Sequence, residues 1–309
     1  MNPAIELRHL RYFVVLAEEL HFGRAAQRLA IAQPSLSVQI RDLERAVGAS
    51  LLERTRRRVQ LTAAGRVFLD GARQTLAQAE RAVQDAQRAQ RGEIGRVSLG
   101  FVGSAAYAVL PRLLRAFRAV YPDVALHLSG MTTREQVAAR AERRLDLGLL
   151  RLLVIEEVDA RLTERLAWRV VACEPLLAVL PSEHPLAMWE RVSLAALAHE
   201  SFILYPRADS PAIRDAILAC CRAAGFSPDV VYESGEMQAI VGLVAGGVGV
   251  ALVIAPEDYR ATGDVIFKPL AGDAIPSWEM ALAWRSARGD DDLTPAARAL
   301  LTLSETLWP

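Results

Sequence analysis

The sequence contains few of the residues that build metal centres and disulfide frameworks. Its 309 residues include three cysteines and five histidines, which form neither a CxxC pair nor a Cys/His cluster with metal-ligand spacing. Cys220 and Cys221 are adjacent in an apolar helical pattern, AILACCRAAG, and neighbours on a helix point apart. This pattern favours thiols in a hydrophobic core. We therefore expect no metal site and no cofactor.

Common catalytic signatures are missing as well. The sequence has no Walker loop and no G-x-S-x-G elbow, and GGVGVA lacks the spacing of a dinucleotide fingerprint. His199 and Glu200 lack the second histidine of a zinc protease helix. These absences predict a protein that is not an enzyme.

Long hydrophobic runs are scarce. Residues 239–255 are the main candidate for a membrane span, with 17 uncharged residues. The run contains four glycines, and its second part, VGVALVIA, suits a buried strand. A helix, a turn and a parallel strand of a soluble domain explain it better than a span. No signal peptide precedes the first helix, so we expect a cytoplasmic protein with no membrane partner.

Lysine is almost absent, since Lys268 is the only one among 36 basic residues. The neutral total conceals an uneven distribution of charge. Residues 1–91 contain 15 arginines and nine acidic residues, a net charge of +6, so residues 92–309 have a net charge of −6. A basic front joined to an acidic body suggests an end that binds nucleic acid and a second part with another task.

The stretch from Phe22 to Glu44 has the pattern of two short amphipathic helices joined by a tight turn. The inner faces would comprise Ala25, Ala26, Leu29, Leu36, Ile40 and Leu43. Pro34 stands at the start of the second helix, where a missing amide is harmless. Its outward side chains would be Ser35, Ser37, Val38, Gln39 and Arg41, which suit base edges and phosphates. An ordinary helical hairpin is the alternative interpretation.

The flanks of this stretch favour DNA binding. Leu7 to Leu20 has helical spacing and would complete a three-helix core. In LLERTRRRVQLTAAG, which ends at Gly65, apolar residues can pair as a short hairpin with arginines at its tip. Such a wing would follow the phosphate backbone and reach into the minor groove. A solvated arginine run is the plainer alternative.

A long helix without proline is predicted from Thr62 to Arg91. Its apolar seam is narrow and consists of Leu69, Ala72, Leu76, Ala79, Val83 and Ala86. A seam of this kind favours a homodimer, which would place two recognition helices on a two-fold axis. Packing of the helix against the chain's own body is the alternative.

After Gly92 the pattern changes to alternating strands and helices, typical of an α/β fold with mostly parallel sheets. About nine strands favour two subdomains with a cleft between them. Ser104, Thr132, Thr133 and Arg151 follow predicted strands, where ligands bind in open α/β sheets. Helix amides, hydroxyls and a guanidinium favour a small organic anion. Helix capping and a surface ion pair are the plainer roles for these residues.

Over its whole length the chain resembles the LysR-type transcriptional regulators. The strongest motif is LRHLRYFVVLAEELHFGRAAQRLAIAQPSLSVQIRDLERAVGASLLERTRRRVQLTAAG, which is similar to that family's winged helix-turn-helix. GFVGSAAYAVLPRLLRAFRAVYPDVALHL, MTTREQ, LDLGLLR and FILYP resemble the branch that controls aromatic-compound catabolism, including benzoate- and muconate-responsive regulators.

The resemblance implies an all-α winged helix-turn-helix domain, a long linker helix and an α/β effector domain of two Rossmann-like subdomains, like periplasmic binding proteins. We expect the DNA-binding domain at residues 1–65, the linker helix at 66–91 and the effector-binding domain at 92–309. Subdomain I would take residues 96–168 and 273–309, and subdomain II residues 169–272. The two crossover strands would lie near Trp168 to Ala172 and Leu270 to Ile275.

The family pattern also suggests contact residues. DNA contacts would come from Gln33, Pro34, Ser35, Ser37 and Gln39 at bases, with Arg41, Arg54 and Arg57 at phosphates or the minor groove. Effector contacts would come from Ser104, Thr132, Thr133, Arg151, Arg207, Ser210, Met237 and Ile275. The chain departs from this branch at the charged residues Arg207 and Asp209, which suggests an altered effector. It also departs at Val38, where relatives often carry a basic residue; valine loses one polar contact and favours a thymine methyl.

These features together predict a transcriptional regulator whose partners are double-stranded DNA and a small organic anion, an aromatic acid or a dicarboxylate. The family implies a pair of dimers, a homotetramer, with RNA polymerase as a further candidate partner. A thiol-redox switch involving Cys173, Cys220 or Cys221 is an alternative within the family. An α/β enzyme and a solute-binding protein that does not bind DNA are the alternatives from other classes.

Overall fold

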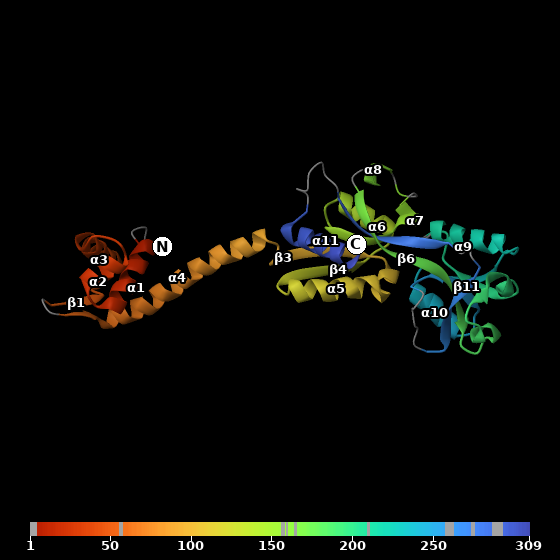
Figure 1. Cartoon of the computed structure of the whole chain (residues 1–309), viewed down its shortest axis with the longest axis horizontal. Helices are drawn as coiled ribbons and strands as arrows, with labels where there is room; N and C mark the ends of the chain where they lie inside the picture. Colours follow the sequence, from red (N-terminus) through yellow and green to blue (C-terminus); the bar gives the residue numbers. More distant parts are fainter. Residues whose placement is uncertain are drawn as a thin grey trace. The chain divides into compact units, whose positions relative to one another are not determined.

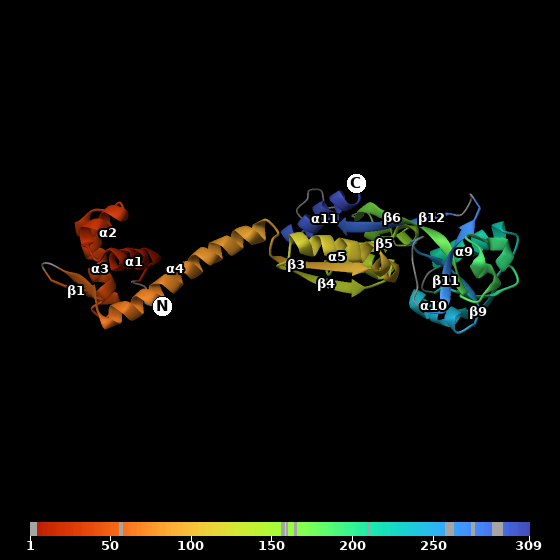
Figure 2. The same ribbon diagram turned by 60° about the horizontal axis from the view of Figure 1, so that its bottom comes forward.

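The computed structural model describes residues 5–55, 58–155, 158, 160–163, 166–208, 211–256, 263–272, 276–285 and 293–309. The chain divides into two compact units, Met1–Arg88 and Ala89–Pro309. Figure 1 shows the elements of each unit in sequence colours, and Figure 2 shows them after a rotation of 60°.

The amino-terminal unit is built on three short helices, a hairpin and one long helix. These are α1 (Leu7–Glu19), α2 (Phe22–Arg28), α3 (Gln33–Val47), β1 (Leu52–Arg54), β2 (Val59–Leu61) and α4 (Ala63–Gln90). Leu36, Ile40 and Leu43 of α3 are completely buried with Phe13 of α1 and Ala25 of α2. The predicted inner faces therefore form one core, which confirms the helix-turn-helix.

The hairpin packs closely on the start of α4. β1 and β2 are antiparallel, with Leu52 opposite Leu61, as the sequence predicts. The Thr62 amide donates to the Leu51 carbonyl at 3.0 Å. A side chain at Gly65 would place its Cβ 2.0 Å from the same carbonyl oxygen, which is far inside van der Waals contact. Glycine at this position therefore allows α4 to meet the wing.

The apolar side chains of helix α4 become less buried along its length. Near its start, Phe68 and Leu69 pack against the three-helix core, and Ala72 is buried. Farther along, Leu76 and Ala79 are half-buried, whereas Val83 is 59% exposed. The second half of the predicted seam thus has no apolar cover within the described part of this single chain.

The second unit contains two α/β subdomains. Subdomain I comprises β3 (Gly95–Phe101), η1 (Gly103–Tyr107), α5 (Val109–Val120), β4 (Val124–Gly130), α6 (Thr133–Ala141), β5 (Leu147–Arg151), α7 (Leu152–Ile155), α8 (Ala160–Thr163), β12 (Ser277–Arg285) and α11 (Pro295–Leu307). Alternation along its strands sends side chains to two cores. Leu149 faces the core under α5 and α11, whereas Leu150 packs with Val137 of α6. Subdomain I therefore carries helices on both faces of its sheet.

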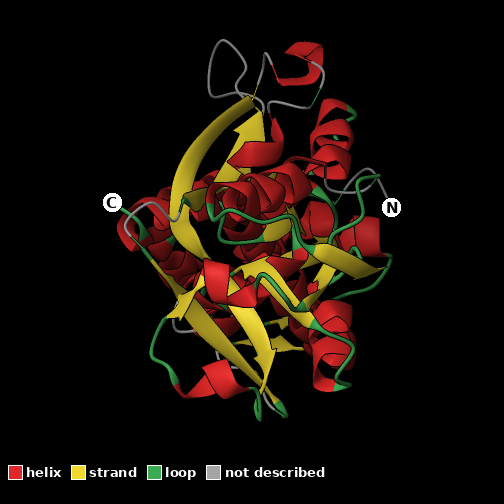
Figure 3. Ribbon diagram, turned by 90° about the vertical axis from the view of Figure 1, so that its right-hand side faces the viewer, coloured by secondary structure: helices red, strands yellow, loops and turns green. Residues whose placement is uncertain are grey.

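Subdomain II comprises η2 (Pro185–Met188), β7 (Val192–Ser193), η3 (Leu194–Leu197), β8 (Ser201–Leu204), α9 (Pro211–Ala223), β9 (Asp229–Glu233), α10 (Met237–Ala245), β10 (Val250–Ile254) and β11 (Val265–Ala271). All five residues of β10 are buried, as expected for a strand covered on both faces. Figure 3 distinguishes the strands, helices and loops by colour.

One long strand, β6 (Leu166–Pro181), connects the two subdomains. Its first part, up to Pro175, pairs with β12, and from Leu176 onward it pairs with β10 and β11. The change of partner therefore falls at Pro175–Leu176, later than the predicted crossover at Trp168–Ala172. Residues 169–175 accordingly belong with subdomain I. The hydrophobic pattern cannot locate this point, because the strand is continuous through it.

Five of the nine described strand pairings in the body are parallel, in line with the expectation of mostly parallel sheets, and four are antiparallel, so the sheets are mixed. The path is β4-β3-β5-β12-β6-β10-β8-β9. β3 pairs in parallel with β4 and β5, and β8 with β9 and β10, but β6 and β12 are antiparallel to their neighbours. The antiparallel pairings arise because the chain crosses between subdomains on these strands.

The glycine-rich run at residues 239–255 forms the end of α10, a turn and β10. Gly247 occupies this turn with φ +73°, a left-handed conformation that glycine adopts without steric cost. Among the described residues, no helix is both long and apolar enough to span a membrane. The sequence-based preference for helix, turn and strand is confirmed.

Candidate functional site

A pocket of about 560 Å³ lies between the two subdomains, at the ends of strands and the starts of helices. Most of its lining is apolar, from Phe101, Val102, Tyr107, Met131, Val154, Tyr205, Ile213, Met237 and Ile254. Its polar lining includes Ser104, Thr132, Thr133, Arg134, Glu135, Arg151, Glu236 and Gln238. A mostly apolar pocket with a few placed polar groups suits a small organic molecule.

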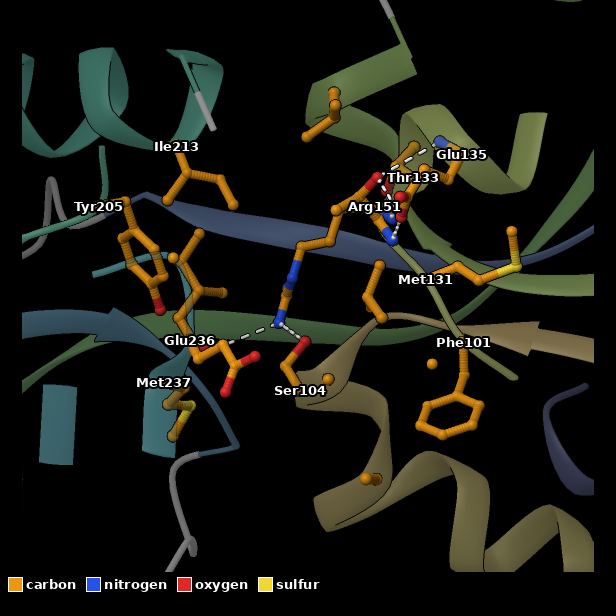
Figure 4. A pocket seen from close by; sticks show the side chains of 18 of the residues that line it. Phe101, Ser104, Met131, Thr133, Glu135, Arg151, Tyr205, Ile213, Glu236 and Met237 are labelled. Carbon is orange, nitrogen blue, oxygen red and sulfur yellow. Dashed lines mark hydrogen bonds between the residues drawn. The ribbon is translucent and has the colours of Figure 1, made fainter. Parts of the chain in front are cut away.

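Arg151 is the polar centre of this pocket and is only 3% exposed. Figure 4 shows its side chain reaching across the pocket towards Ser104. One terminal nitrogen, Nη2, donates to Ser104 Oγ at 3.1 Å and to the Ile254 carbonyl at 3.3 Å, and pairs with Glu174. Its other terminal nitrogen, Nη1, has no hydrogen-bond partner within the described residues. Arg151 is thus a buried member of an ion pair, and not a surface residue.

The partner of Arg151 was not identified from the sequence. Glu174 is 2% exposed, and burial raises the pKa of its carboxyl group, although Arg151 opposes that shift. Burial also raises the pKa of Tyr205 to about 12. The Tyr205 phenol therefore stays neutral. The charges of Arg151 and Glu174 largely compensate each other, so Arg151 supplies less net positive charge to a ligand than the sequence suggested.

Helix starts provide a second source of positive potential. α6, α9 and α10 all begin with residues that line or adjoin the pocket, and the unpaired amides at helix starts favour anions. At α6, Thr132 and Glu135 form a capping box, with the Thr132 amide donating to Glu135 Oε2 at 2.8 Å. At α10, Glu236 precedes the helix and makes no side-chain cap. The amides at α10 are therefore less engaged than those at α6.

Two of the predicted hydroxyls have different surroundings. Thr133 is 3% exposed, and its Oγ1 accepts from the Arg151 amide at 3.1 Å. This contact fixes the end of β5 against α6. Ser104 lies on η1 and meets the Arg151 guanidinium. Ser104 is therefore the better placed of the two to bind a ligand together with Arg151.

The structure does not bring every predicted effector residue together. Ser104, Thr132, Thr133, Arg151 and Met237 line the pocket. Arg207 does not line it, because its side chain is 71% exposed and pairs with Asp215 at 3.4 Å. Asp209, Ser210 and Ile275 lie outside the described residues.

The recognition helix α3 presents the predicted polar face. Gln33, Pro34, Ser35 and Arg41 are exposed, and Val38 is 44% exposed. Ser37 and Gln39 are half-buried. The side chains are thus available on one face while Leu36 and Ile40 hold the opposite face in the core.

Gln39 is oriented by a buried histidine of α1. His9 is 7% exposed; its Nδ1 accepts from the Glu6 amide at 3.1 Å, and its Nε2 lies 3.0 Å from Gln39 Oε1. Because Nδ1 accepts a backbone proton, Nε2 must carry the ring proton and donate it to Gln39. This bond occupies the Gln39 oxygen and leaves its amide nitrogen as the group turned away from His9.

Arg54, the described wing arginine among the predicted DNA contacts, interacts with side chains of the protein itself. Arg54 pairs with Glu44 at 2.5 Å and lies over the Phe22 ring, with its Cζ 5.2 Å from the centroid. Glu44 also accepts from the amides of Leu51 and Leu52. These contacts brace the wing against α3, a role that the sequence did not reveal. Arg57 lies outside the described residues.

The cysteines form no disulfide. Cys221 is buried, and burial raises the pKa of its thiol to about 11. Burial raises the pKa of the half-buried Cys220 as well. A raised pKa reduces the thiolate, which is the reactive form. Among the residues the structure describes, no cluster of histidine, cysteine and carboxylate side chains is suited to a metal ion.

The fold and the pocket define a two-part DNA-binding regulator with a ligand-binding body. Two family models match the chain: "Bacterial regulatory helix-turn-helix protein, lysR family" at residues 7–66 and "LysR substrate binding domain" at residues 90–308. The chain therefore belongs to the LysR family of transcriptional regulators. It is a DNA-binding regulator and not an enzyme.

Individual relatives cover nearly the whole chain. The uncharacterized HTH-type transcriptional regulator YnfL of Escherichia coli (strain K12) is 43% identical over 295 residues, 95% of this chain and 96% of YnfL. The regulator CatR of Pseudomonas putida is 39% identical over 97% of this chain and 98% of its own length. The crystal structure of full-length CbnR complexed with its target DNA has a TM-score of 0.82 at 26% identity, covering 98% of this chain and 99% of CbnR.

Proposed function

We propose that a small organic carboxylate, an aromatic acid or a dicarboxylate, binds the pocket between the subdomains and controls the DNA-binding activity of the regulator. The observation that carries this proposal is the mostly apolar pocket around the Ser104–Arg151 contact, where Nη1 of Arg151 has no described partner. A ligand with an apolar part and one charged end matches such a site. Similarity to CatR agrees with the aromatic branch suggested by the sequence motifs.

The lining favours an anion over a cation or a neutral sugar. Helices α6, α9 and α10 begin there, and their amide ends favour negative charge. The Arg151–Glu174 pair is nearly neutral in itself, so a ligand carboxylate would gain hydrogen bonds from Ser104 and Arg151 without displacing water from an isolated cation. Ligand would shift the two subdomains only through its different affinity for their arrangements.

The ligand part is tested by thermal denaturation of the full chain with benzoate and with succinate. We expect at least one of these probes to raise the melting temperature in a concentration-dependent way. Ser104→Ala should weaken the response by roughly fivefold, because one hydrogen bond is lost. The matched control is Ser227→Ala, an exposed serine outside the pocket. The pocket assignment would be contradicted if no aromatic acid or dicarboxylate raised the melting temperature. It would also be contradicted if Ser104→Ala and Ser227→Ala responded equally to the ligand.

We further propose that the regulator binds DNA as a homodimer, or a pair of dimers, through α4. The exposed half of the α4 seam, which includes Val83, supports this assembly, because a second copy would cover it. Sedimentation of the full chain tests it. Val83→Glu should lower the oligomeric state, whereas Val67→Glu, at an exposed position with 76% exposure outside the seam, should not.

The DNA contacts proposed for α3 and the wing separate into two kinds. Ser37→Ala should alter discrimination between operators, because the family pattern suggests a contact of Ser37 with bases. Arg57→Ala should weaken binding to all sequences and reduce the salt dependence, as expected for a phosphate contact. An operator preference or a salt slope that stays the same would refute the corresponding assignment. Val38 supplies a methyl surface at the same helix face, which favours thymine.

A further inference from the structure

Gln136 of α6 is a buried polar residue behind the wall of the pocket between the subdomains. Its side chain is 0% exposed, and it does not line the pocket. Its Nε2 amide donates to the Met131 carbonyl and to the Leu149 carbonyl, at 3.0 Å in each case. Its Oε1 has no hydrogen-bond partner in the part of the chain that the structure describes. An unpaired buried oxygen is costly, so the two donated bonds are the evident gain from a glutamine at this position.

The two carbonyls that Gln136 bonds belong to strands that are not neighbours. Met131 directly follows β4, and Leu149 lies on β5. In the sheet β3 separates these strands, because the order is β4-β3-β5. The Met131 amide donates to the Phe101 carbonyl at 2.9 Å, and the Val102 amide donates to the Leu149 carbonyl at 3.0 Å. The backbone thus ties each outer strand to β3, whereas Gln136 joins the two outer strands across it.

Two glycines make room for this crossing. Gly100 of β3 and Gly148 of β5 are opposite each other in the sheet. A Cβ at Gly148 would lie 2.5 Å from Gln136 Oε1, and a Cβ at Gly100 would lie 3.0 Å from Gln136 Cγ. Glycine in a strand often marks such a close approach of another group to the backbone. The two strands therefore form a recess in which the glutamine side chain fits.

The strand ends that Gln136 links carry polar groups of the pocket. Ser104 follows β3, Thr133 begins α6 after β4, and Arg151 ends β5. Figure 4 shows these three side chains at the pocket. Thr133 Oγ1 also accepts from the Arg151 amide at 3.1 Å, so α6 holds the end of β5 by a second bond. A shift of β5 relative to β4 would change the spacing of these groups.

We infer that Gln136 is a positioning residue of this pocket. Its amide fixes the ends of β4 and β5 relative to each other, and thereby holds Ser104, Thr133 and Arg151 in the arrangement that binds ligand. Groups that are fixed in advance bind more tightly, because the ligand does not have to order them. The inference rests on the proposed function of the pocket and adds to it a residue that does not line the pocket.

Ligand binding by Gln136→Met tests this role, because methionine has a similar length and lacks both donors. The melting temperature of the full chain is followed against the concentration of benzoate and of succinate. We expect the apparent affinity for a probe that binds the parent to fall by roughly tenfold, since the strand ends are no longer held together.

The matched control is Val137→Ala at the next position of α6. Val137 is 1% exposed and packs with Leu150 in a core outside the pocket. This variant should lower the melting temperature without ligand, because it leaves a cavity, and it should leave the affinity for the probe unchanged. An equal loss of affinity in Gln136→Met and Val137→Ala, or no loss in Gln136→Met, would overturn the inference.

Hydrogen exchange without ligand tests the positioning directly. The amides of Val102 and Met131 should exchange several-fold faster in Gln136→Met than in the parent or in Val137→Ala, because local opening of the strand ends becomes easier. Unchanged exchange at both amides would overturn the inference. If the parent responds to neither benzoate nor succinate, the carboxylate proposal fails for these probes, and exchange still decides whether Gln136 holds the strand ends.

Gly148→Ala reaches the same hydrogen bonds from the opposite side. Its Cβ would meet Gln136 Oε1, and the glutamine amide should turn away from the two carbonyls. We expect weaker probe binding, as in Gln136→Met. The two losses should not add in the double variant, because both changes act on the same bonds. Fully additive losses would contradict a role of Gln136 in the effect of Gly148→Ala and would count against the inference.

Discussion

Both compact units have ion pairs at the surface, but among the described residues the body also contains a deeply buried pair, which the amino-terminal unit lacks. In the amino-terminal unit, arginines form ion pairs at the surface, such as Arg45 with Asp42 at 2.8 Å, with side chains 79% and 43% exposed. In the body, Arg151 and Glu174 are paired at 4% and 2% side-chain exposure. A surface that meets DNA phosphates needs accessible cations, whereas a ligand site needs polar groups fixed before the ligand arrives.

Removal of a buried partner should have the largest effect. Glu174→Ala leaves Arg151 buried without its carboxylate, and we expect a loss of about 3–5 kcal/mol in the free energy of unfolding. Asp42→Ala, the surface control, should change it by about 1 kcal/mol or less. Urea denaturation measures both. Similar losses in the two variants would refute the contrast between the units, and Arg151→Met should restore part of the stability lost in Glu174→Ala.

The next effect concerns the close approach of α4 to the wing. Gly65→Ala forces a Cβ against the Leu51 carbonyl, and we expect a loss of about 2–3 kcal/mol in stability. Gly71 lies on the same helix with no atom within 4 Å of an added Cβ. Gly71→Ala should therefore stabilise the protein by about 0.5–1 kcal/mol. Thermal denaturation distinguishes the opposite signs, and a stabilising Gly65→Ala would show that the wing adjusts freely.

A smaller effect should appear only at alkaline pH. The pKa of Tyr205 rises to about 12 in the folded chain, so between pH 10 and 12 the unfolded chain loses the phenolic proton first. Stability therefore falls as the pH rises through this window. Tyr205→Phe should flatten this fall relative to the parent, whereas Tyr232→Phe, at a position 52% exposed, should not. Denaturation series at several pH values provide the measurement, and parallel curves for the parent and Tyr205→Phe would contradict it.

The smallest effect should be on operator discrimination. His9→Ala frees the Gln39 oxygen and should reduce base discrimination by roughly fivefold, the equivalent of one hydrogen bond. The loss should vanish in a Gln39→Ala background, because His9 acts through Gln39. Binding to matched operator variants tests this, with His127→Ala as the exposed histidine control. An equal loss in both backgrounds would indicate that His9 serves general packing.

Sequence periodicity predicted the helices and strands well, but it predicted poorly which of them pair in the fold. The alternation of strands and helices after Gly92 was predicted, and the 239–255 run was correctly divided into helix, turn and strand. Apolar spacing encodes which face is buried, so such elements can be inferred locally. The predicted crossover near Trp168–Ala172 falls on β6, but the change of partner comes later in this strand, because pairing with β12 or with β10 has no signature in the sequence of a continuous strand.

The candidate site shows the same division. Ser104, Thr132, Thr133, Arg151 and Met237 were predicted from strand ends and family motifs, and the structure places all five in one pocket. Glu174 and Tyr205 were not foreseen as neighbours of Arg151, since Glu174 lies on β6 and Tyr205 follows β8, both far from Arg151 in the sequence. Arg207 follows a strand like the others, yet its side chain points into solvent and pairs with Asp215.

The sequence by itself determined the family, the helix-turn-helix, the basic front and the alternating α/β body, because those properties depend on local spacing and composition. Only the tertiary structure decided which charges are neutralised. Arg151, Arg140 and Arg54 are the same residue type in the sequence. In the structure, Arg151 is paired in a buried cleft, Arg140 has buried donors without partners among the described residues, and Arg54 braces the wing. That difference depends on burial and on partners distant in the chain, which set the energy of a charge and which no local pattern records.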